Sequence, residues 1–234
     1  MAGPFAHDTG VQLGRFNSAL DWSSFDCGRG DLNEFVRDDA ARLEQRDVTR
    51  VYMAIVDNVP IGYVALLADT IVLKTGESKK LDLVHGDSKS IPALKVGRLG
   101  VDQKSHERFA GVGKTLMWMA YQTAIGARET LGCRLLTVDA VHDDTHDAVG
   151  YYEHLGFIRN KSTPAGEVCP LCRKLLDRCP HCAADFPQGE ASYVEVPGRT
   201  VSMRFDLRLD PLPPWAVQPQ LAERSSTLES TSQK

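Results

Sequence analysis

The sequence contains no long hydrophobic run and carries no excess of positive charge. No stretch approaches the roughly 18 consecutive apolar residues of a membrane-spanning helix, so we expect no membrane partner. Residues 1–8 include neither a basic leader nor an apolar stretch, and no secretory signal is visible. We therefore expect a cytoplasmic protein. The net charge of −4 also provides no general attraction to nucleic acid or to an acidic membrane surface.

Aromatic residues make up only 7% of the 234 residues, but the hydrophobic fraction of 42% is that of an ordinary globular protein. A chain of this length can bury a substantial core, and we expect one domain with a small appendage. β-rich runs predict strands over 11–16, 51–56, 61–72, 91–102, 135–141 and 201–209. Helical spacing of apolar residues predicts helices over 31–47, 111–128 and 143–155. Strands before, between and after helices predict an α/β sandwich.

The connecting segments carry predictions of their own. Asp31, with Glu34 three residues later, is a candidate helix N-cap. Residues 57–60 are the expected hairpin turn, and the polar stretch 74–90 is expected to be a loop. From residue 210 onward, Pro-rich and then Ser/Thr-rich sequence predicts a disordered tail over 210–234.

Glycine and positive charge gather where the strand ending near residue 102 gives way to a helix. The segment consists of Arg108, Phe109, Ala110, Gly111, Val112, Gly113 and Lys114. Amide groups at a helix start lack partners and the helix dipole is positive there, so this segment suits a pyrophosphate. Glycines let the backbone approach the phosphates, and Arg108 and Lys114 add positive charge.

Two other interpretations of this segment exist. The glycines could serve packing at an ordinary strand–turn–helix junction. A dinucleotide-binding unit is disfavoured, because its glycine pattern would stand near the start of the fold rather than in mid-chain.

A second motif follows about forty residues downstream, after the next predicted strand. Residues 148–157 read Ala-Val-Gly-Tyr-Tyr-Glu-His-Leu-Gly-Phe. Together with the Arg108 segment, this motif resembles the GNAT acetyltransferases, in which a Gln/Arg-x-x-Gly-x-Gly/Ala loop precedes an aromatic-Tyr-Glu-x-x-Gly-Phe helix. The resemblance runs over 11–157 and resumes at 201–209. It implies the α/β GNAT sandwich, with a central mixed sheet flanked by helices, a core over 1–157 and a final strand within 196–209.

The resemblance implies roles for individual residues. Arg108 to Gly113 would bind the pyrophosphate of acetyl-CoA, with Lys114 at the rim, and the backbone of Leu99, Gly100 and Val101 would pair with the pantetheine arm. Tyr152 matches the tyrosine that protonates the departing thiolate in many members.

Helix geometry favours Tyr152 over its neighbour as this acid. Ala148, Tyr151 and Leu155 share one helix face and are expected in the core, whereas Tyr152 is rotated from Tyr151 by about 100°. The alternative for Tyr152 is an amphipathic core tyrosine with a hydrated tip.

The sequence assigns no general base. Many GNAT enzymes place a glutamate on the strand before the phosphate loop, and Arg98 and Gly100 stand there instead. Asp139, His142 and ordered water are the alternatives for the group that removes the amine proton.

Four further stretches concern the acceptor. Residues 25–28, 32–36, 91–93 and 97–102 resemble the GNAT toxins of toxin–antitoxin pairs, which acetylate the amino group of aminoacyl-tRNA. This resemblance implies charged tRNA as acceptor and an antitoxin as partner, with a homodimer as a further assembly. By analogy, the basic residues Lys95, Arg98, Lys104 and Arg108 would face the tRNA end or the cofactor. The alternatives are a small-molecule or protein amine as acceptor, or a binding module that has lost catalysis.

Four of the six cysteines fall in one short window. Two Cys-Pro-x-Cys pairs, Cys169 with Cys172 and Cys179 with Cys182, stand six residues apart. Four thiolates in two such pairs suit tetrahedral Zn²⁺ and leave no open catalytic position. We predict a structural zinc knuckle in an insertion over 158–195, with redox-active pairs as the alternative. The isolated Cys27 and Cys133 are expected to be small buried hydrophobic residues.

Overall fold

The computed structural model describes residues 10–73, 75–83, 90–142, 146–160, 199–218 and 222–223. The chain divides into two compact units. The first combines Met1–Thr70, Pro92–Leu136 and Asp206–Lys234, and the second combines Ile71–Ile91 and Thr137–Phe205. Among the described residues, no helix is long and apolar enough to cross a membrane.

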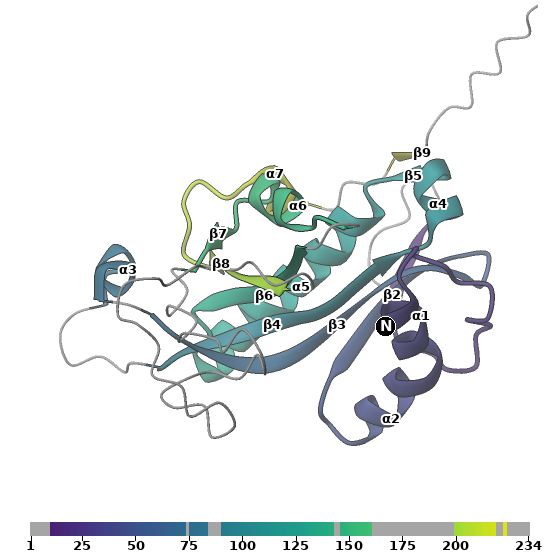
Figure 1. The fold of residues 1–234 in the computed structure, drawn as a ribbon, viewed down its shortest axis with the longest axis horizontal. Helices are drawn as coiled ribbons and strands as arrows, with labels where there is room; N and C mark the ends of the chain where they lie inside the picture. The colour runs from purple at the N-terminus through teal and green to yellow at the C-terminus, as the bar shows by residue number, and fades with distance from the viewer. Residues whose placement is uncertain are drawn as a thin grey trace, which may run out of the picture. The chain divides into compact units, whose positions relative to one another are not determined.

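The first unit is built on strands that lie in the order β1 (Gln12–Arg15), β2 (Arg50–Val56), β3 (Val59–Val72) and β4 (Ser90–Val101) (Figure 1). The pairs β1–β2 and β2–β3 are antiparallel. All of these strands were predicted from the sequence. The hairpin between β2 and β3 is tighter than predicted, because Asp57 and Asn58 turn the chain alone, with φ of 50° and 63°. Pro60 lies within β3 rather than in the turn.

Two helical layers cover the strands of this unit. The predicted helix from residue 31 is α1 (Gly30–Glu34), a π-helical stretch (Phe35–Asp39) and α2 (Ala40–Gln45). Its side chains share a buried cluster with alternate strand residues, of which Met53 and Tyr63 are examples. The opposite strand face meets α5 (Val112–Leu131), because a Cβ on Gly62 would contact Leu116 at 3.0 Å. Strand residues of opposite parity thus face the two helical layers.

The predicted N-cap of the first helix is wrong. Arg29 occupies the N-cap position, and no side chain caps the helix there. Asp31 lies in the first turn, where its carboxylate accepts a hydrogen bond from the Arg29 side chain at 2.9 Å. Asp31 therefore pairs with Arg29 instead of capping the helix.

The polar segment after β4 and part of the predicted tail have regular structure. The helix α4 (Gln103–Arg108) and the short strand β5 (Phe109–Ala110) precede α5. Within the tail predicted as disordered, α7 (Pro214–Val217) packs on α5, with Trp215 against Tyr121 at 6.0 Å between ring centroids. The backbone of β9 (Ala222–Glu223) pairs antiparallel with β5. The first unit thus includes helical and strand residues that follow the last predicted strand, over 201–209.

The second unit contains strands in the order β6 (Leu135–His142), β8 (Arg199–Asp206) and β7 (Ile158–Arg159). Its helices are α3 (Thr75–Lys80) and α6 (Val149–His154). The helix α3 lies in the stretch predicted as a loop. Glu77 anchors it there, because its carboxylate accepts a 2.7 Å hydrogen bond from Arg204 of β8, and both side chains are 4% exposed.

The helix α6 begins later than predicted. Residues 146–148 are not helical, and the Asp147 carboxylate accepts a 2.9 Å hydrogen bond from the Val149 amide at the start of the helix. The predicted strand over 201–209 is confirmed as β8, which begins two residues earlier and ends at Asp206. Met203 and Phe205 are buried as predicted, but Arg204 between them is buried too, where it pairs with Glu77.

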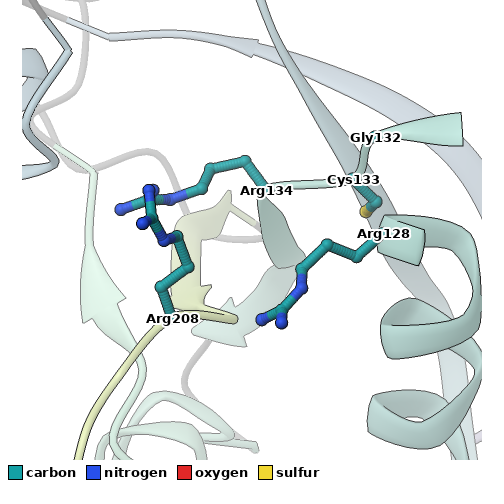
Figure 2. A pocket seen from close by; sticks show the side chains of 5 residues that line it. All are labelled: Arg128, Gly132, Cys133, Arg134 and Arg208. Carbon is teal, nitrogen blue, oxygen red and sulfur yellow. The ribbon is translucent and has the colours of Figure 1, made fainter.

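A pocket opens at the C-terminal end of α5 in the first unit (Figure 2). Its volume is about 440 Å³, and it is lined by Arg128, Gly132, Cys133, Arg134 and Arg208. Gly132 ends the helix with φ of 76°, a backbone conformation that favours glycine.

Candidate functional site

The predicted phosphate loop forms the junction between β4 and α5, all within the first unit. Gly111 is the N-cap of α5 with φ of 86°, a left-handed conformation that other residues adopt only with strain. It has no side chain to cap the helix, and the first amides of α5 have no intrahelical acceptor. These amides and the positive end of a 20-residue helix dipole can accept an anion.

Some side chains of this loop are buried in the core, and others lie at the rim of the proposed phosphate site. Phe109 and Val112 are buried, so only their backbone can contact a ligand. Arg108 is the exposed last residue of α4, with its guanidinium carbon 4.8 Å from the centroid of the Phe109 ring. Gly113 and Lys114 are half-buried in the first turn of α5. Arg108 and Lys114 thus have the placement of rim charges.

The strand end at Leu99, Gly100 and Val101 is shaped by a close approach. A Cβ on Gly100 would lie 2.8 Å from Cε1 of Tyr63, so only glycine fits beside this ring. The Tyr63 hydroxyl donates a 2.8 Å hydrogen bond to the carbonyl of Leu32, which links β3 to α1. The packing of the predicted pantetheine strand therefore depends on the helical segment that follows residues 25–28.

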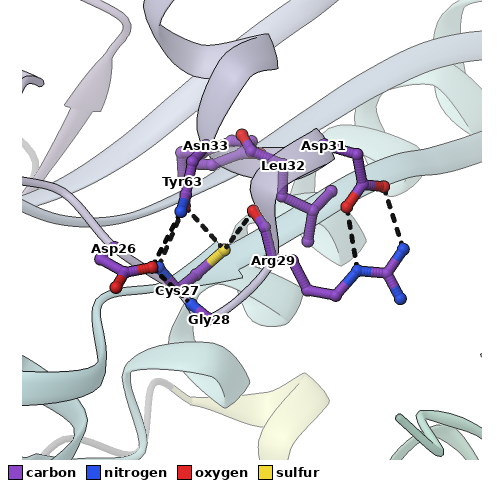
Figure 3. A network of polar contacts seen from close by, with 8 residues as sticks. All are labelled: Asp26, Cys27, Gly28, Arg29, Asp31, Leu32, Asn33 and Tyr63. Carbon is purple, nitrogen blue, oxygen red and sulfur yellow. Dashed lines mark hydrogen bonds and ion pairs between the residues drawn. The ribbon is translucent and has the colours of Figure 1, made fainter. Parts of the chain in front are cut away.

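Residues 25–28 form a hydrogen-bonded loop, and Figure 3 shows Asp26, Cys27 and Gly28 of this loop beside Asn33. Asp26 Oδ1 accepts hydrogen bonds from the Asn33 side chain and the Gly28 amide, both at 2.8 Å. The Gly28 amide and the Asn33 side chain together lower the pKa of Asp26. Asp102 Oδ2 accepts a 3.1 Å hydrogen bond from the Asp26 amide, and the Gln103 amide donates to the Asp26 carbonyl at 2.9 Å.

Sequence reasoning missed Asp102 and Arg37 as anchors of this loop. Asp102 follows a strand and has Ser105 three residues later, which is the spacing of a helix N-cap. Arg37 lies in the π-helical stretch, where it donates hydrogen bonds to the carbonyls of Trp22 and Phe25 at 3.2 and 2.5 Å. Such a stretch re-aims one turn of a helix, and the sequence carries no clear signal for it.

The two isolated cysteines are not nucleophiles at neutral pH. Cys133 is buried as predicted, and burial raises the pKa of its thiol. Cys27 is only half-buried, and its thiol donates to Asn33 Oδ1 at 3.1 Å. Burial again raises the pKa of this thiol, so Cys27 stays protonated and serves the loop.

Tyr152 lies on α6, in the second unit, and its environment differs from the predicted one. Its side chain is 6% exposed and packs edge-on against Tyr151 and Phe157, at 5.1 and 5.5 Å between ring centroids. Tyr151 is the more exposed of the pair, so the prediction that Tyr151 fills the core while Tyr152 turns out of it is wrong. The reason is that Val149 and Tyr152, three apart on a short helix, form its buried face.

Burial raises the pKa of both tyrosines well above the ordinary value of their side chain. Both are therefore neutral proton donors at physiological pH. The Tyr151 hydroxyl is buried and has no hydrogen-bond partner among the residues that the structure describes. Tyr152 as the acid stays a prediction.

The candidates for the general base and the metal have different positions. Asp139 is exposed on β6, and His142 Nδ1 lies 3.3 Å from Asp147 Oδ1. Arg98 is exposed, with its guanidinium carbon 4.2 Å above the centroid of the Phe35 ring. Over the described ranges, no group of three His, Cys, Asp or Glu side chains could hold a metal ion. The predicted zinc ligands Cys169, Cys172, Cys179 and Cys182 lie outside those ranges.

Comparison with known proteins finds one matching family and several similar proteins. A sequence model described as the acetyltransferase (GNAT) family matches residues 16–157. A tRNA-acetylating toxin of Mycobacterium tuberculosis is 25% identical over 150 residues, which are 64% of this chain and 86% of the toxin.

Several solved structures have a similar fold. The toxin AtaT complexed with acetyl-methionyl-tRNAfMet matches with a TM-score of 0.56 and 24% identity, over 65% of this chain and 89% of that one. A tyrosine-to-phenylalanine mutant of KacT matches with a TM-score of 0.58 and 23% identity, over 67% of this chain and 91% of that one. These likenesses confirm the predicted α/β GNAT fold, a mixed sheet flanked by helices. Because the family model spans more than half of its 234 residues, this chain belongs to the acetyltransferase (GNAT) family.

Proposed function

We propose that this chain transfers the acetyl group of acetyl-CoA to the amino group of an aminoacyl-tRNA. The supporting observation is its match to the tRNA-acetylating toxin, which extends over 86% of that toxin and lies within a GNAT family match. Acetyl-CoA is the co-substrate, as the family and the acetyl-CoA complex of AtaT indicate.

The cofactor site that we propose uses the junction from β4 to α5. The amides after Gly111 would bind the pyrophosphate, with Arg108 and Lys114 at its rim. The backbone of Leu99, Gly100 and Val101 would pair with the pantetheine arm. The left-handed Gly111 and the absence of a side-chain cap on α5 among the described residues support this assignment.

The chemistry is the attack of a neutral amine on a thioester. The nitrogen forms a bond to the acetyl carbon, the carbon–sulfur bond then breaks, and the thiolate takes a proton. We assign that proton to the hydroxyl of Tyr152, which matches the tyrosine of the family motif and is protonated at neutral pH. The amine proton leaves to a base or to water, and a backbone amide near Val101 would stabilise the oxyanion.

The acceptor side that we propose uses the loop at residues 25–28 and the neighbouring basic side chains. Arg98 stacks on Phe35 and is exposed, which leaves the edge of its guanidinium able to contact a phosphate. Lys95, Lys104 and Arg108 supply further positive charge. We propose an antitoxin as a partner, since AtaT has been solved with the antitoxin AtaR. A second copy of this chain is a further partner that we propose.

The four cysteines form a separate proposal. Two Cys-Pro-x-Cys pairs suit one tetrahedral Zn²⁺ ion held by Cys169, Cys172, Cys179 and Cys182. The insertion over 158–195 between the GNAT core and the final strand would then be stabilised by this ion.

Acetyl-CoA consumption by the purified protein tests the proposal. Charged tRNA is offered in one reaction, and free amino acids, polyamines and peptides in others. Turnover with charged tRNA alone supports the proposed acceptor. Turnover only with a small amine or a peptide refutes that acceptor while leaving the acetyltransferase, and binding without any turnover refutes catalysis on the tested amines.

A further inference from the structure

The pocket at the C-terminal end of α5 brings three arginines together (Figure 2). Arg128 comes from the last turns of α5, Arg134 immediately precedes β6, and Arg208 lies in the segment after β8. Figure 2 shows the guanidinium groups of Arg134 and Arg208 pointing to the same side of the pocket. Cys133 and Gly132 complete its lining. These residues come from two separate stretches of the chain, 128–134 and the segment around Arg208, so folding is required to assemble the pocket.

Hydrogen bonds hold two of the arginines, Arg128 and Arg134, in place. Arg128 donates a 2.8 Å hydrogen bond to the carbonyl of Leu207, and the Leu207 amide donates to the carbonyl of Arg134 at 3.2 Å. Arg134 also donates to Asp206 Oδ2 at 2.8 Å, with these side chains 17% and 25% exposed. Arg128 and Arg134 are therefore held in place before any ligand arrives, which lowers the entropic cost of binding, whereas the Arg208 side chain is exposed.

The pocket keeps an excess of positive charge. In the part of the chain that the structure describes, Asp206 is the carboxylate that pairs with these arginines, and neither Arg128 nor Arg208 has an ion-pair partner. Like charges held in one small pocket repel, and an anion between them removes this cost. Guanidinium groups present several N–H donors in a plane, a geometry that matches phosphate oxygens.

The pocket is separate from the proposed cofactor site. The phosphate loop lies at the N-terminus of α5 and the pocket at its C-terminus, so a 20-residue helix of roughly 30 Å separates them. The α5 dipole is negative at the pocket end, so the anion site there depends on the arginines alone.

We propose that this pocket binds a phosphate group, and that the sugar-phosphate backbone of the tRNA supplies it. The choice of RNA rests on the proposed function, whereas the pocket's preference for phosphate rests on its arginines. A free phosphorylated small molecule is the other source of the same chemistry.

The test measures binding of uncharged tRNA, and separately of inorganic pyrophosphate, to the full chain saturated with acetyl-CoA, which occupies the proposed phosphate loop. The variants are Arg208→Gln, the double variant Arg128→Gln with Arg208→Gln, and Arg208→Lys, which keeps the charge. Arg46→Gln, at an exposed arginine after α2, has the same charge change and serves as control. Thermal melts verify that each variant is folded.

The proposal predicts that Arg208→Gln weakens tRNA binding about fivefold at low salt and lowers the slope of log Kd against log salt by about one. The double variant should lose more, Arg208→Lys less, and Arg46→Gln should match the wild type. If pyrophosphate binding is lost while tRNA binding is unchanged, the phosphate site stands with a small molecule as its source.

Unchanged affinity for both probes in the folded double variant would overturn the proposal. So would arginine-dependent binding of an acidic peptide by a protein that binds neither probe. Acetyl transfer to charged tRNA is measured independently, so a protein without this activity that still binds pyrophosphate through the arginines refutes the proposed function and keeps the phosphate site.

Discussion

The carboxylate of Asp102 accepts a hydrogen bond from the amide of Asp26, a residue 76 positions earlier in the chain, at 3.1 Å. Its other oxygen accepts from the Ser105 amide at 2.9 Å and caps α4. One buried side chain thus joins the loop at residues 25–28 to the strand end that leads into the phosphate loop. In the proposed function, these two segments serve the acceptor and the cofactor respectively.

Replacing Asp102 with alanine should destabilise the protein by about 1–3 kcal/mol, because a helix cap is lost and a part-buried amide loses its acceptor. Urea unfolding measures this change. Asp102→Asn, which keeps one acceptor oxygen, should lose less. The exposed Asp38→Ala is the control and should change stability by no more than about 0.5 kcal/mol. Equal effects of Asp102→Ala and Asp38→Ala would contradict the anchoring role.

Gly111→Ala should weaken acetyl-CoA binding and destabilise the fold by about 1 kcal/mol, because alanine is strained at a φ of 86°. Gly126 is the matched control on the same helix, since no atom would lie within 4 Å of an added Cβ. Gly126→Ala should stabilise α5 by roughly 0.5–1 kcal/mol and leave the cofactor affinity unchanged. Calorimetric titration with acetyl-CoA compares the two variants, and an unaltered affinity in Gly111→Ala would argue against the phosphate loop.

Tyr152→Phe should lower kcat by about 10²–10⁴ while leaving acetyl-CoA affinity nearly unchanged, as removal of a general acid does. Tyr151→Phe is the paired control, and its kcat should stay close to that of the wild type. Because burial raises the pKa of Tyr152, its hydroxyl stays protonated as the pH rises. Deprotonation of Tyr152 should therefore not reduce kcat at any pH below about 10. Normal turnover in Tyr152→Phe would eliminate this tyrosine as the acid.

Glu77→Gln should cost about 3–5 kcal/mol of stability, because it leaves the charge of Arg204 buried without its carboxylate. Glu153→Gln is the control in the same unit, since the pair of Glu153 with Arg159 has side chains 47% and 57% exposed. An exposed pair contributes no more than about 1 kcal/mol. Chemical denaturation of both variants compares the two losses, and similar small values would show that α3 does not depend on this ion pair.

Metal analysis of the purified protein should find about one zinc ion per chain. A double variant, Cys169→Ser with Cys172→Ser, should lose the metal, because two thiolates cannot complete a tetrahedral site. Cys27→Ser is the control, since this thiol already donates to Asn33 and lies apart from the cluster in sequence. Full zinc content in the double variant would refute the four-cysteine site.

The sequence allowed the strands, the long helix α5 and the glycine junction before that helix to be predicted, because each depends on local patterns of apolar residues, glycine and charge. The faces of α6 were assigned wrongly because the assignment used Ala148, which lies outside this short helix. The α3 helix could not be foreseen, since Arg204, its buried partner, lies 127 residues away. For the same reason the pairing of Asp102 with Asp26 and the arginine pocket required the folded chain.

The most direct test of the central claim follows radiolabelled acetyl from acetyl-CoA onto tRNA. Charged tRNA, the same tRNA after deacylation, and the free amino acid are incubated with the protein in parallel. The proposed function predicts label on charged tRNA alone, released by mild alkali as an N-acetyl amino acid. Label on the deacylated tRNA or on the free amino acid, with none on the charged tRNA, would contradict it.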